Sequence, residues 1–366
     1  VPNRDVLVSG NLINGHLDSL PGADIHGNCE FVTYRDNRLL AGISFGGDYI
    51  TIAGNDIRTN AGTEKNGISA SELLGPNIVI RDNTITATGA LTSGNSAAIN
   101  FSKNSSSWRY AARSGTLAIR GNTINMASYD GAAVYVRNGQ ANDMLATSTT
   151  MIDLDVSDNL VSGTSASTAR TGVEIVGQPT GTADKGFRTV RVAGNTLNNA
   201  TLSVNAPGAR TTVVAENDVL GAAVQGIVYG AAANYHGTYQ TEEELVIVKN
   251  NRVVRPNSTG IQVVGVDVNR SFVQIRGNHA VSACQGGTTG SNSTDSSLYV
   301  ADAAVALIEG NTFGKMPNDA TGAQTRCIGL NTVTTVFERG NQNVGTVVTN
   351  EIASVTDGTY FQAADE

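Results

Sequence analysis

The sequence predicts an all-β solenoid of parallel strands, and three observations lead to this fold class. An asparagine recurs inside a short apolar pattern along the chain, a second apolar string lies between successive copies, and the segments between them are rich in Gly, Ser, Thr and Asn. Such internal repeats are typical of solenoids, in which each repeat packs only on its neighbours. We therefore expect about eleven coils, with residues 1–343 forming the body and residues 344–366 a C-terminal strand or cap.

The first string reads apolar-x-x-Asn-x-apolar, as in Ile80-x-x-Asn83-x-Ile85. The asparagine positions are Asn11, Asn37, Asn55, Asn83, Asn122, Asn159, Asn195, Asn217, Asn251, Asn278, Asn311 and Asn341, the last in a degraded copy. Asparagine tolerates the left-handed conformation of a corner, and its amide can bond the amides of neighbouring coils. Because so many asparagines share one motif position, a stacked corner is favoured over ordinary turn residues.

The second string is a short apolar alternation such as Gly67-Ile68-Ser69-Ala70 or Gly172-Val173-Glu174-Ile175. Both strings alternate with period two, which predicts short strands with one buried face. The intervening segments are too rich in Gly, Ser, Thr and Asn for helical crossovers. Repeats longer than a bare coil should project their surplus residues as loops on one side, at 102–115, 138–150, 177–187, 231–244 and 285–296.

Composition and charge limit the classes of partner that the protein is expected to bind. The net charge is −8, from 24 Lys and Arg against 32 Asp and Glu, which argues against a nucleic-acid partner. No apolar run approaches the roughly 20 residues of a membrane-spanning helix, so no membrane partner is expected. Cys29, Cys284 and Cys327 form no CxxC pair and have no clustered histidines, so we predict no metal, no cofactor and no disulfide. The chain begins Val1-Pro2, which we interpret as a mature or excised fragment without a signal peptide.

The two ladders, I-x-x-N-x-I and G-I-x-V, resemble the right-handed parallel β-helix of the pectin-lyase-like superfamily along the whole chain. Within it the sequence is most similar to the β-helical body of a bacteriophage tailspike, because its loops are polar and no signal peptide is seen. This resemblance implies a homotrimer on the virion tail that binds and cleaves bacterial surface polysaccharide, capsule or O-antigen. The catalytic motifs vWiDH, NTD, DD, GHG and RIK of related enzymes are absent, as is a paired-Asp calcium ladder. Candidate site residues must therefore come from strand geometry.

Alternation places the residue between the two apolar positions of each second strand on the outer face. This column reads Ser69, Asn100, Tyr135, Glu174, Ser203, Val228, Gln262 and Tyr299. Since adjacent coils lie about 4.8 Å apart, Asn100, Tyr135 and Glu174 should stack, with Arg137 beside them. We predict a glycan-binding patch in which Glu174 is an acid or nucleophile; the alternative is a solvated strand face.

The loops beside this column add further candidates. Lys103, Trp108 and Arg170 would contact the glycan, with a sugar ring stacking on Trp108, the only tryptophan. The candidate catalytic partner for Glu174 is an aspartate, either Asp130 or one of the pair Asp153 and Asp155. His236, in the loop 231–244, could serve as base and acid in β-elimination. The alternative for His236 is a flexible polar loop.

A rival site lies on the first strand, where Asp153-Leu154-Asp155 puts two carboxylates on one outward face, roughly 7 Å apart at the backbone. Carboxylate pairs separated by about 5 to 9.5 Å hydrolyse glycosides. The alternative is a surface ion pair with Arg191. With carboxylates dominating the candidates, we favour hydrolysis over β-elimination.

Other outward positions of the first strand are unusually apolar, namely Leu7, Thr51, Val79, Ala118, Val213, Ile247 and Leu307. A long apolar stripe of this kind suggests burial against another subunit, with a trimer axis as the natural candidate. The leading function is a depolymerase of bacterial surface polysaccharide. The alternatives are a non-catalytic glycan-binding fibre or adhesin, and a secreted bacterial lyase or epimerase.

Overall fold

A computed structural model describes most of the chain. The described residues are 3–13, 23–25, 29–59, 66–73, 75, 77–87, 97–102, 114–126, 131–138, 151–163, 171–177, 186–206, 209–222, 224–230, 244–265, 271–284, 296–316, 326–345 and 359–362. Within these ranges the secondary structure is β-strand, and each strand pairs in parallel with strands of the neighbouring coils. The fold is a right-handed parallel β-helix, as the sequence predicts. No helix in these ranges has the length and apolarity to cross a membrane.

The chain forms two compact units. The first comprises residues 1–164 and 171–190, and the second residues 165–170 and 191–366. Each coil contributes a first strand, a short strand after the motif asparagine, and a second strand. The predicted cap contains one described strand, Thr359–Gln362, which pairs with a first strand of the second unit.

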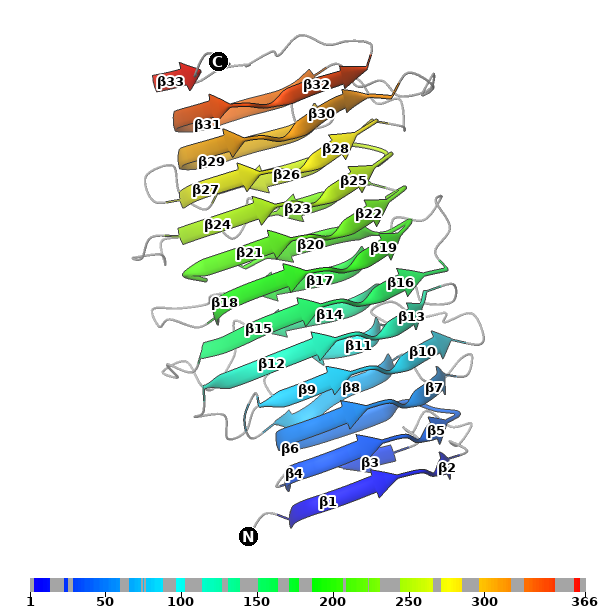
Figure 1. Ribbon diagram of the computed structural model, residues 1–366. Helices are drawn as coiled ribbons and strands as arrows, with labels where there is room; N and C mark the ends of the chain where they lie inside the picture. Colours follow the sequence, from blue (N-terminus) through cyan, green and yellow to red (C-terminus); the bar gives the residue numbers. More distant parts are fainter. Residues whose placement is uncertain are drawn as a thin grey trace. The chain divides into compact units, whose positions relative to one another are not determined.

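In the first unit successive coils stack from β1 to β15, which follow one another in the colour order of Figure 1. Its first strands are β1 (Asn3–Ser9), β4 (Cys29–Arg35), β6 (Ile43–Ala53), β9 (Ile78–Arg81), β12 (Gly115–Arg120) and β15 (Met151–Ser157). Its short strands are β2 (Leu12–Ile13), β5 (Arg38–Leu39), β7 (Asp56–Thr59), β10 (Thr84–Ala87), β13 (Thr123–Asn125) and β16 (Leu160–Ser162). Its second strands are β3 (Ala23–Ile25), the first part of β6, β8 (Asn66–Leu73), β11 (Ala97–Ser102), β14 (Ala132–Asn138) and β17 (Thr171–Gly177).

The second unit repeats this order, and β18 (Gly186–Ala193) runs from the first unit into it. Its first strands are β21 (Thr211–Ala215), β24 (Glu244–Lys249), β27 (Ser271–Arg276), the later parts of β29 (Ser296–Glu309) and β31 (Arg326–Arg339), and β33 (Thr359–Gln362). Its short strands are β19 (Thr196–Asn198), β22 (Asp218–Leu220), β25 (Arg252–Val254), β28 (His279–Val281), β30 (Thr312–Lys315) and β32 (Gln342–Gly345). Its second strands are β20 (Thr201–Asn205), β23 (Ile227–Tyr229), β26 (Ile261–Val264) and the first parts of β29 and β31.

The core of each unit is a set of stacked apolar columns. On the first strands of the first unit, one inward column runs through Tyr34, Ile52, Ile80, Ile119 and Val156, each at most 1% exposed. Alternation places these side chains inside, and parallel in-register pairing puts each on its counterpart in the next coil. The three cysteines, Cys29, Cys284 and Cys327, are buried and are not joined in a disulfide.

The predicted asparagine corner is present in both units. Asn83 donates from its backbone N and its Nδ2 to Oδ1 of Asn122, at 3.1 and 3.0 Å, and Asn122 bonds Asn159 in the same way. In the second unit the same bonds link Asn195 through to Asn341. The interior asparagines are buried, so the ladder satisfies amides that water does not reach.

One detail of this corner differs from the expectation. The left-handed residue is the one before the asparagine, most often a glycine or an aspartate, as at Gly54 (φ 66°), Asp82 (φ 57°) and Gly121 (φ 63°). This turn leaves the asparagine side chain pointing into the stack. The loops expected at 102–115, 138–150, 177–187, 231–244 and 285–296 lie almost entirely outside the described residues.

Candidate functional site

The second strands of the first unit carry the predicted outward column. Register pairs Ser69 with Asn100, Asn100 with Tyr135, and Tyr135 with Glu174. Ser44 of β6 extends the column below Ser69. The side chains of this column are half-buried. The predicted alignment of Asn100, Tyr135 and Glu174 is therefore confirmed as geometry, and it brings an amide, a phenol and a carboxyl group onto one face.

Glu174 has the electrostatics of an acid. Its side chain is half-buried on β17, and burial raises its pKa above the ordinary value of 4.5. Desolvation has this effect because it disfavours the charged carboxylate. A carboxyl group kept protonated to higher pH can donate a proton to a leaving oxygen, which is the function of the general acid in glycoside hydrolysis.

The neighbours of Glu174 supply polar groups. Asn100 donates from Nδ2 to Oδ1 of Asn66 at 3.1 Å. Its own Oδ1 is buried, and among the described residues no donor bonds it. Arg137, two residues after Tyr135 on β14, is half-buried and pairs in register with Ser102 and Val176. The column thus places an amide and a guanidinium near Glu174, which are groups that suit a ligand rich in hydroxyl groups.

Five other predicted site residues lie outside the described residues: Lys103, Trp108, Asp130, Arg170 and His236. Their roles stay predictions.

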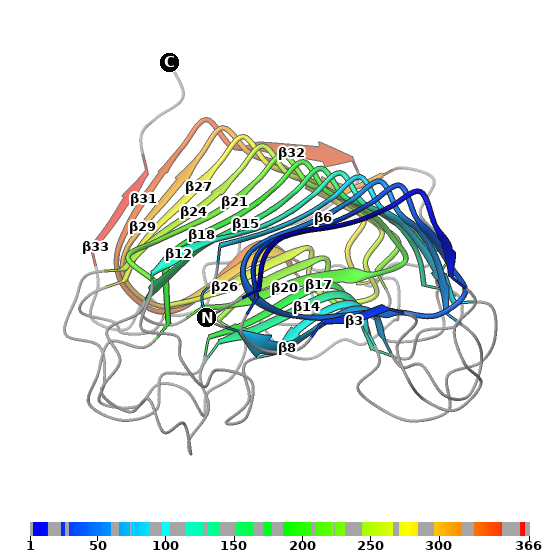
Figure 2. The ribbon, with the colours of Figure 1, turned by 90° about the horizontal axis from the view of Figure 1, so that it is seen from below.

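The structure does not bring Asp153 and Asp155 to Glu174. Both aspartates project outward from β15, in the layer of β12, whereas Glu174 projects from β17, in the layer of β14 (Figure 2). Outward side chains of these two layers point away from each other across the core. The expectation that either aspartate serves as the partner of Glu174 is therefore wrong for this geometry.

Each aspartate of the rival site is held by an arginine. Arg188 donates to both oxygens of Asp153, with Nε–Oδ1 at 2.9 Å, and the Thr189 hydroxyl donates to Oδ1 at 2.7 Å. The Arg188 hydrogen bonds lower the pKa of Asp153 below its usual value, so this carboxyl stays ionised. Asp155 pairs with Arg120 at 2.5 Å. The arrangement fits the alternative interpretation, a surface ion pair, with Arg188 and Arg120 as partners.

A groove that the sequence analysis missed lies on the outer face of β1, β4, β6, β9 and β12. It has a volume of about 610 Å³, and a stacked pair of exposed aromatic rings, Phe31 and Tyr49, projects over it. A signal was available, because Asp5, Phe31, Tyr49 and Asn77 each lie six residues before a motif asparagine. From the sequence we singled out the apolar column four residues before it and, at the position six residues before it, Asp153 alone.

Over the ranges that the structure describes, no three His, Cys, Asp or Glu side chains gather as a metal site.

The architecture defines a class: a parallel β-helix whose stacked strands present columns of polar side chains. Comparison with known proteins agrees, since residues 1–165 match a family model described as Gp49, pectin lyase-like. No curated protein and no solved structure gives a match. The fold fits a pectin-lyase-like β-helix, and the family match itself covers residues 1–165.

Proposed function

We propose that this chain is a phage tailspike depolymerase that binds and cleaves a bacterial surface polysaccharide, capsule or O-antigen, at the Glu174 column. The observation that carries the proposal is a half-buried carboxyl group of raised pKa, in register with Tyr135 and Asn100. The pectin lyase-like match to residues 1–165 supports a polysaccharide as the substrate. Action from the virion tail follows from the proposed tailspike identity, with a secreted bacterial enzyme as the alternative.

In this proposal Glu174 protonates the glycosidic oxygen as the bond to the leaving sugar breaks. Tyr135 and Asn100 hold hydroxyl groups of the glycan, and Arg137 orients the chain. A hydrolase also needs a second carboxylate on the other side of the bond. Asp130, two residues before β14 in the sequence, is the candidate. Hydrolysis is favoured over β-elimination because Glu174 suits an acid.

A glycan-binding fibre without catalysis is the second candidate. One observation favours it: the Asp153 and Asp155 carboxylates lie in another layer and are engaged by arginines. The structure describes no other carboxylate on the second strands β11, β14 and β17 beside Glu174.

Incubation of the purified protein with a panel of bacterial capsules and O-chains separates these functions. A hydrolase shortens at least one glycan and adds one water per cut, as read by mass spectrometry. A lyase adds no water and leaves an ultraviolet-absorbing double bond. A glycan that binds with unchanged chain length would replace the depolymerase by the fibre.

The homotrimer is also a proposal, and the second unit supports it. Two adjacent outward columns of its first strands are mainly apolar. One runs Val213, Ile247, Gln274, Leu307 and Phe337, and the other runs Thr211, Leu245, Phe272, Val305 and Thr335. In the first unit the column is mixed, and Ala118 is buried because its methyl lies between the larger Val79 and Asp155. A broad apolar face of this kind fits a subunit interface.

We expect Phe337→Asp to convert the trimer to monomers, measured by light scattering after size-exclusion chromatography. Phe337 is 42% exposed in the single chain, and a carboxylate buried there in an interface would have no compensating partner. Leu160→Asp is the matched control, since Leu160 is 41% exposed on β16 of the other unit. A trimer mass for the Phe337 variant would exclude this face as the interface.

A further inference from the structure

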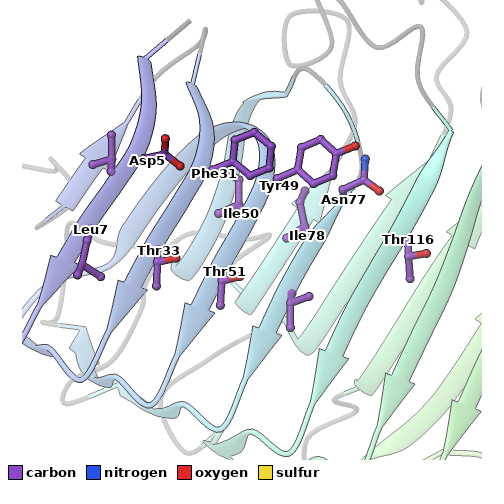
Figure 3. Close-up of a pocket in the computed structure, with 12 residues that line it drawn as sticks. Asp5, Leu7, Phe31, Thr33, Tyr49, Ile50, Thr51, Asn77, Ile78 and Thr116 are labelled. Atoms are coloured by element: carbon purple, nitrogen blue, oxygen red, sulfur yellow. The ribbon is translucent and has the colours of Figure 1, made fainter.

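The groove on the outer face of β1, β4, β6, β9 and β12 combines apolar surface with hydrogen-bonding groups. Its accessible apolar surface includes Leu7 and Val79, with the buried side chains of Ile50 and Ile78 beneath them. Its polar lining comprises Asp5, Thr33, Thr51, Asn77 and Thr116, together with the Tyr49 side chain. Figure 3 shows these groups around one shallow depression, with Phe31 and Tyr49 next to each other and Asn77 beside Tyr49.

The aromatic pair is exposed although it is large. The ring centroids of Phe31 and Tyr49 lie 4.8 Å apart at 15°, and the side chains are 47% and 46% exposed. Both residues, and Asp5 in the coil before them, have left-handed backbone with φ near 57°. Bulky side chains rarely adopt this conformation, and such outliers concentrate at ligand sites.

A buried carboxylate fixes two of the groove residues. Asp48 is 0% exposed, and its Oδ1 accepts from Tyr49 N at 3.0 Å. The same oxygen accepts from Asn77 N at 3.1 Å and Asn77 Nδ2 at 3.0 Å. Gly75 packs so closely that an added Cβ would lie 2.5 Å from Asp48. The groove is therefore a pre-organised site in which the Tyr49 backbone and the Asn77 amide share one anchor.

The charge of the lining selects among ligands. Asp5 is the one ionisable acid among the lining residues, and no lysine or arginine lines the groove. An anionic uronate chain would meet a carboxylate and no cation there. A pyranose, by contrast, offers apolar C–H faces to aromatic rings and hydroxyl groups to threonine and amide partners.

The corresponding surface of the second unit, which we propose as the subunit interface, is mainly apolar. At the motif position of Phe31 and Tyr49, the strands β24, β27 and β29 carry Leu245, Phe272 and Val305, without an amide or a carboxylate. The polar groups of the groove distinguish it from that apolar face.

We propose that the Phe31–Tyr49 groove is a second glycan-binding site that takes a neutral hexopyranose chain, separate from the Glu174 column. It lies on the first-strand layer, whereas Glu174 lies on the second-strand layer. It holds glycan without cleaving it, and it stands whether or not Glu174 is catalytic.

The test is affinity electrophoresis of the full chain through gels containing dextran, mannan, galactan, β-glucan or polygalacturonate. At least one neutral polymer should retard the protein, and polygalacturonate should not. Tyr49→Ala should weaken that retardation at least about tenfold, equivalent to ~1.4 kcal/mol. Tyr49→Phe keeps the ring and should retain most of the binding.

Leu160→Ala is the matched control, because Leu160 is an exposed apolar residue on β16 that lies outside both proposed sites. It should leave retardation by the neutral polymer unchanged. Tyr135→Ala then tells the two sites apart, because it weakens only binding at the Glu174 column. Melting temperatures confirm that each variant is folded. The proposal is overturned if no neutral polymer retards the protein, or if Tyr135→Ala abolishes retardation while Tyr49→Ala does not. It is also overturned if Tyr49→Ala lowers the particle mass, since a second copy would then cover the groove.

Discussion

Glu174→Gln should reduce glycan cleavage by roughly 10²–10⁴-fold while leaving glycan binding nearly intact. The amide matches the shape of the carboxyl group but cannot transfer a proton to the glycosidic oxygen. The measurement is the initial rate of chain shortening on the glycan found in the panel, with affinity measured separately on the same variant. A loss confined to the rate identifies Glu174 as the acid, because a residue that only binds would change affinity.

The pH profile gives this prediction a second readout. Burial raises the pKa of Glu174 in the folded chain, so activity that needs its proton falls as pH rises through that pKa. The free energy of unfolding changes with pH in the same direction as the activity. The contribution of Glu174 to this free energy is fully present below its pKa in the unfolded chain, near 4.5, and is lost as pH rises through the raised pKa of the folded chain. Glu174→Gln removes this loss, so the stability of the variant relative to wild type should increase with pH.

Asp153→Asn is the control for the catalytic prediction, because Asp153 is an ion-paired carboxylate of the other layer. It should retain activity within a few-fold of wild type. If Asp153→Asn abolished cleavage and Glu174→Gln did not, the catalytic site would have to be assigned to β15 in place of β17.

The fold could be predicted from sequence because one residue position marks every coil. The asparagine fixes the register of the first strands, and the second apolar string fixes that of the second strands, so the alignment of Tyr135 with Glu174 could be predicted from the sequence. The ion pairs of Asp153 and Asp155 were harder, because arginine side chains such as Arg188 and Arg120 reach across neighbouring coils. The repeat pattern predicts which residues are neighbours along the backbone. It does not predict which groups the end of a long arginine side chain contacts.

The burial of Glu174 and the anchoring by Asp48 illustrate the same limit. Both depend on what packs beside the strand, which alternation does not reveal. Asp48 follows Gly46-Gly47 in a stretch that resembles a turn, yet it lies fully buried within β6 and bonds Asn77. The sequence alone does not distinguish a buried aspartate that accepts from backbone and amide donors from an aspartate in solvent.

Asn122→Leu should destabilise the chain by about 3–5 kcal/mol, because it removes buried hydrogen-bond partners in a nearly isosteric change. Oδ1 of Asn122 is the acceptor for the backbone N and Nδ2 of Asn83, and water has no access to either donor. The lost Nδ2 also served Ile80 O at 3.1 Å and Asn159 Oδ1 at 2.9 Å. The shift of the urea unfolding midpoint measures the loss.

Asn11→Leu is the matched control at the exposed first step of the same ladder. Asn11 donates to Asn37 Oδ1 at 3.0 Å, but its side chain is exposed, so water replaces the lost partner. We expect a loss below about 1 kcal/mol. Equal losses for the two variants would mean that the ladder contributes through corner geometry alone. A large difference would show that the stability of each coil depends on amides shielded by the coils on both sides, as required of a fold whose repeats pack only on their neighbours.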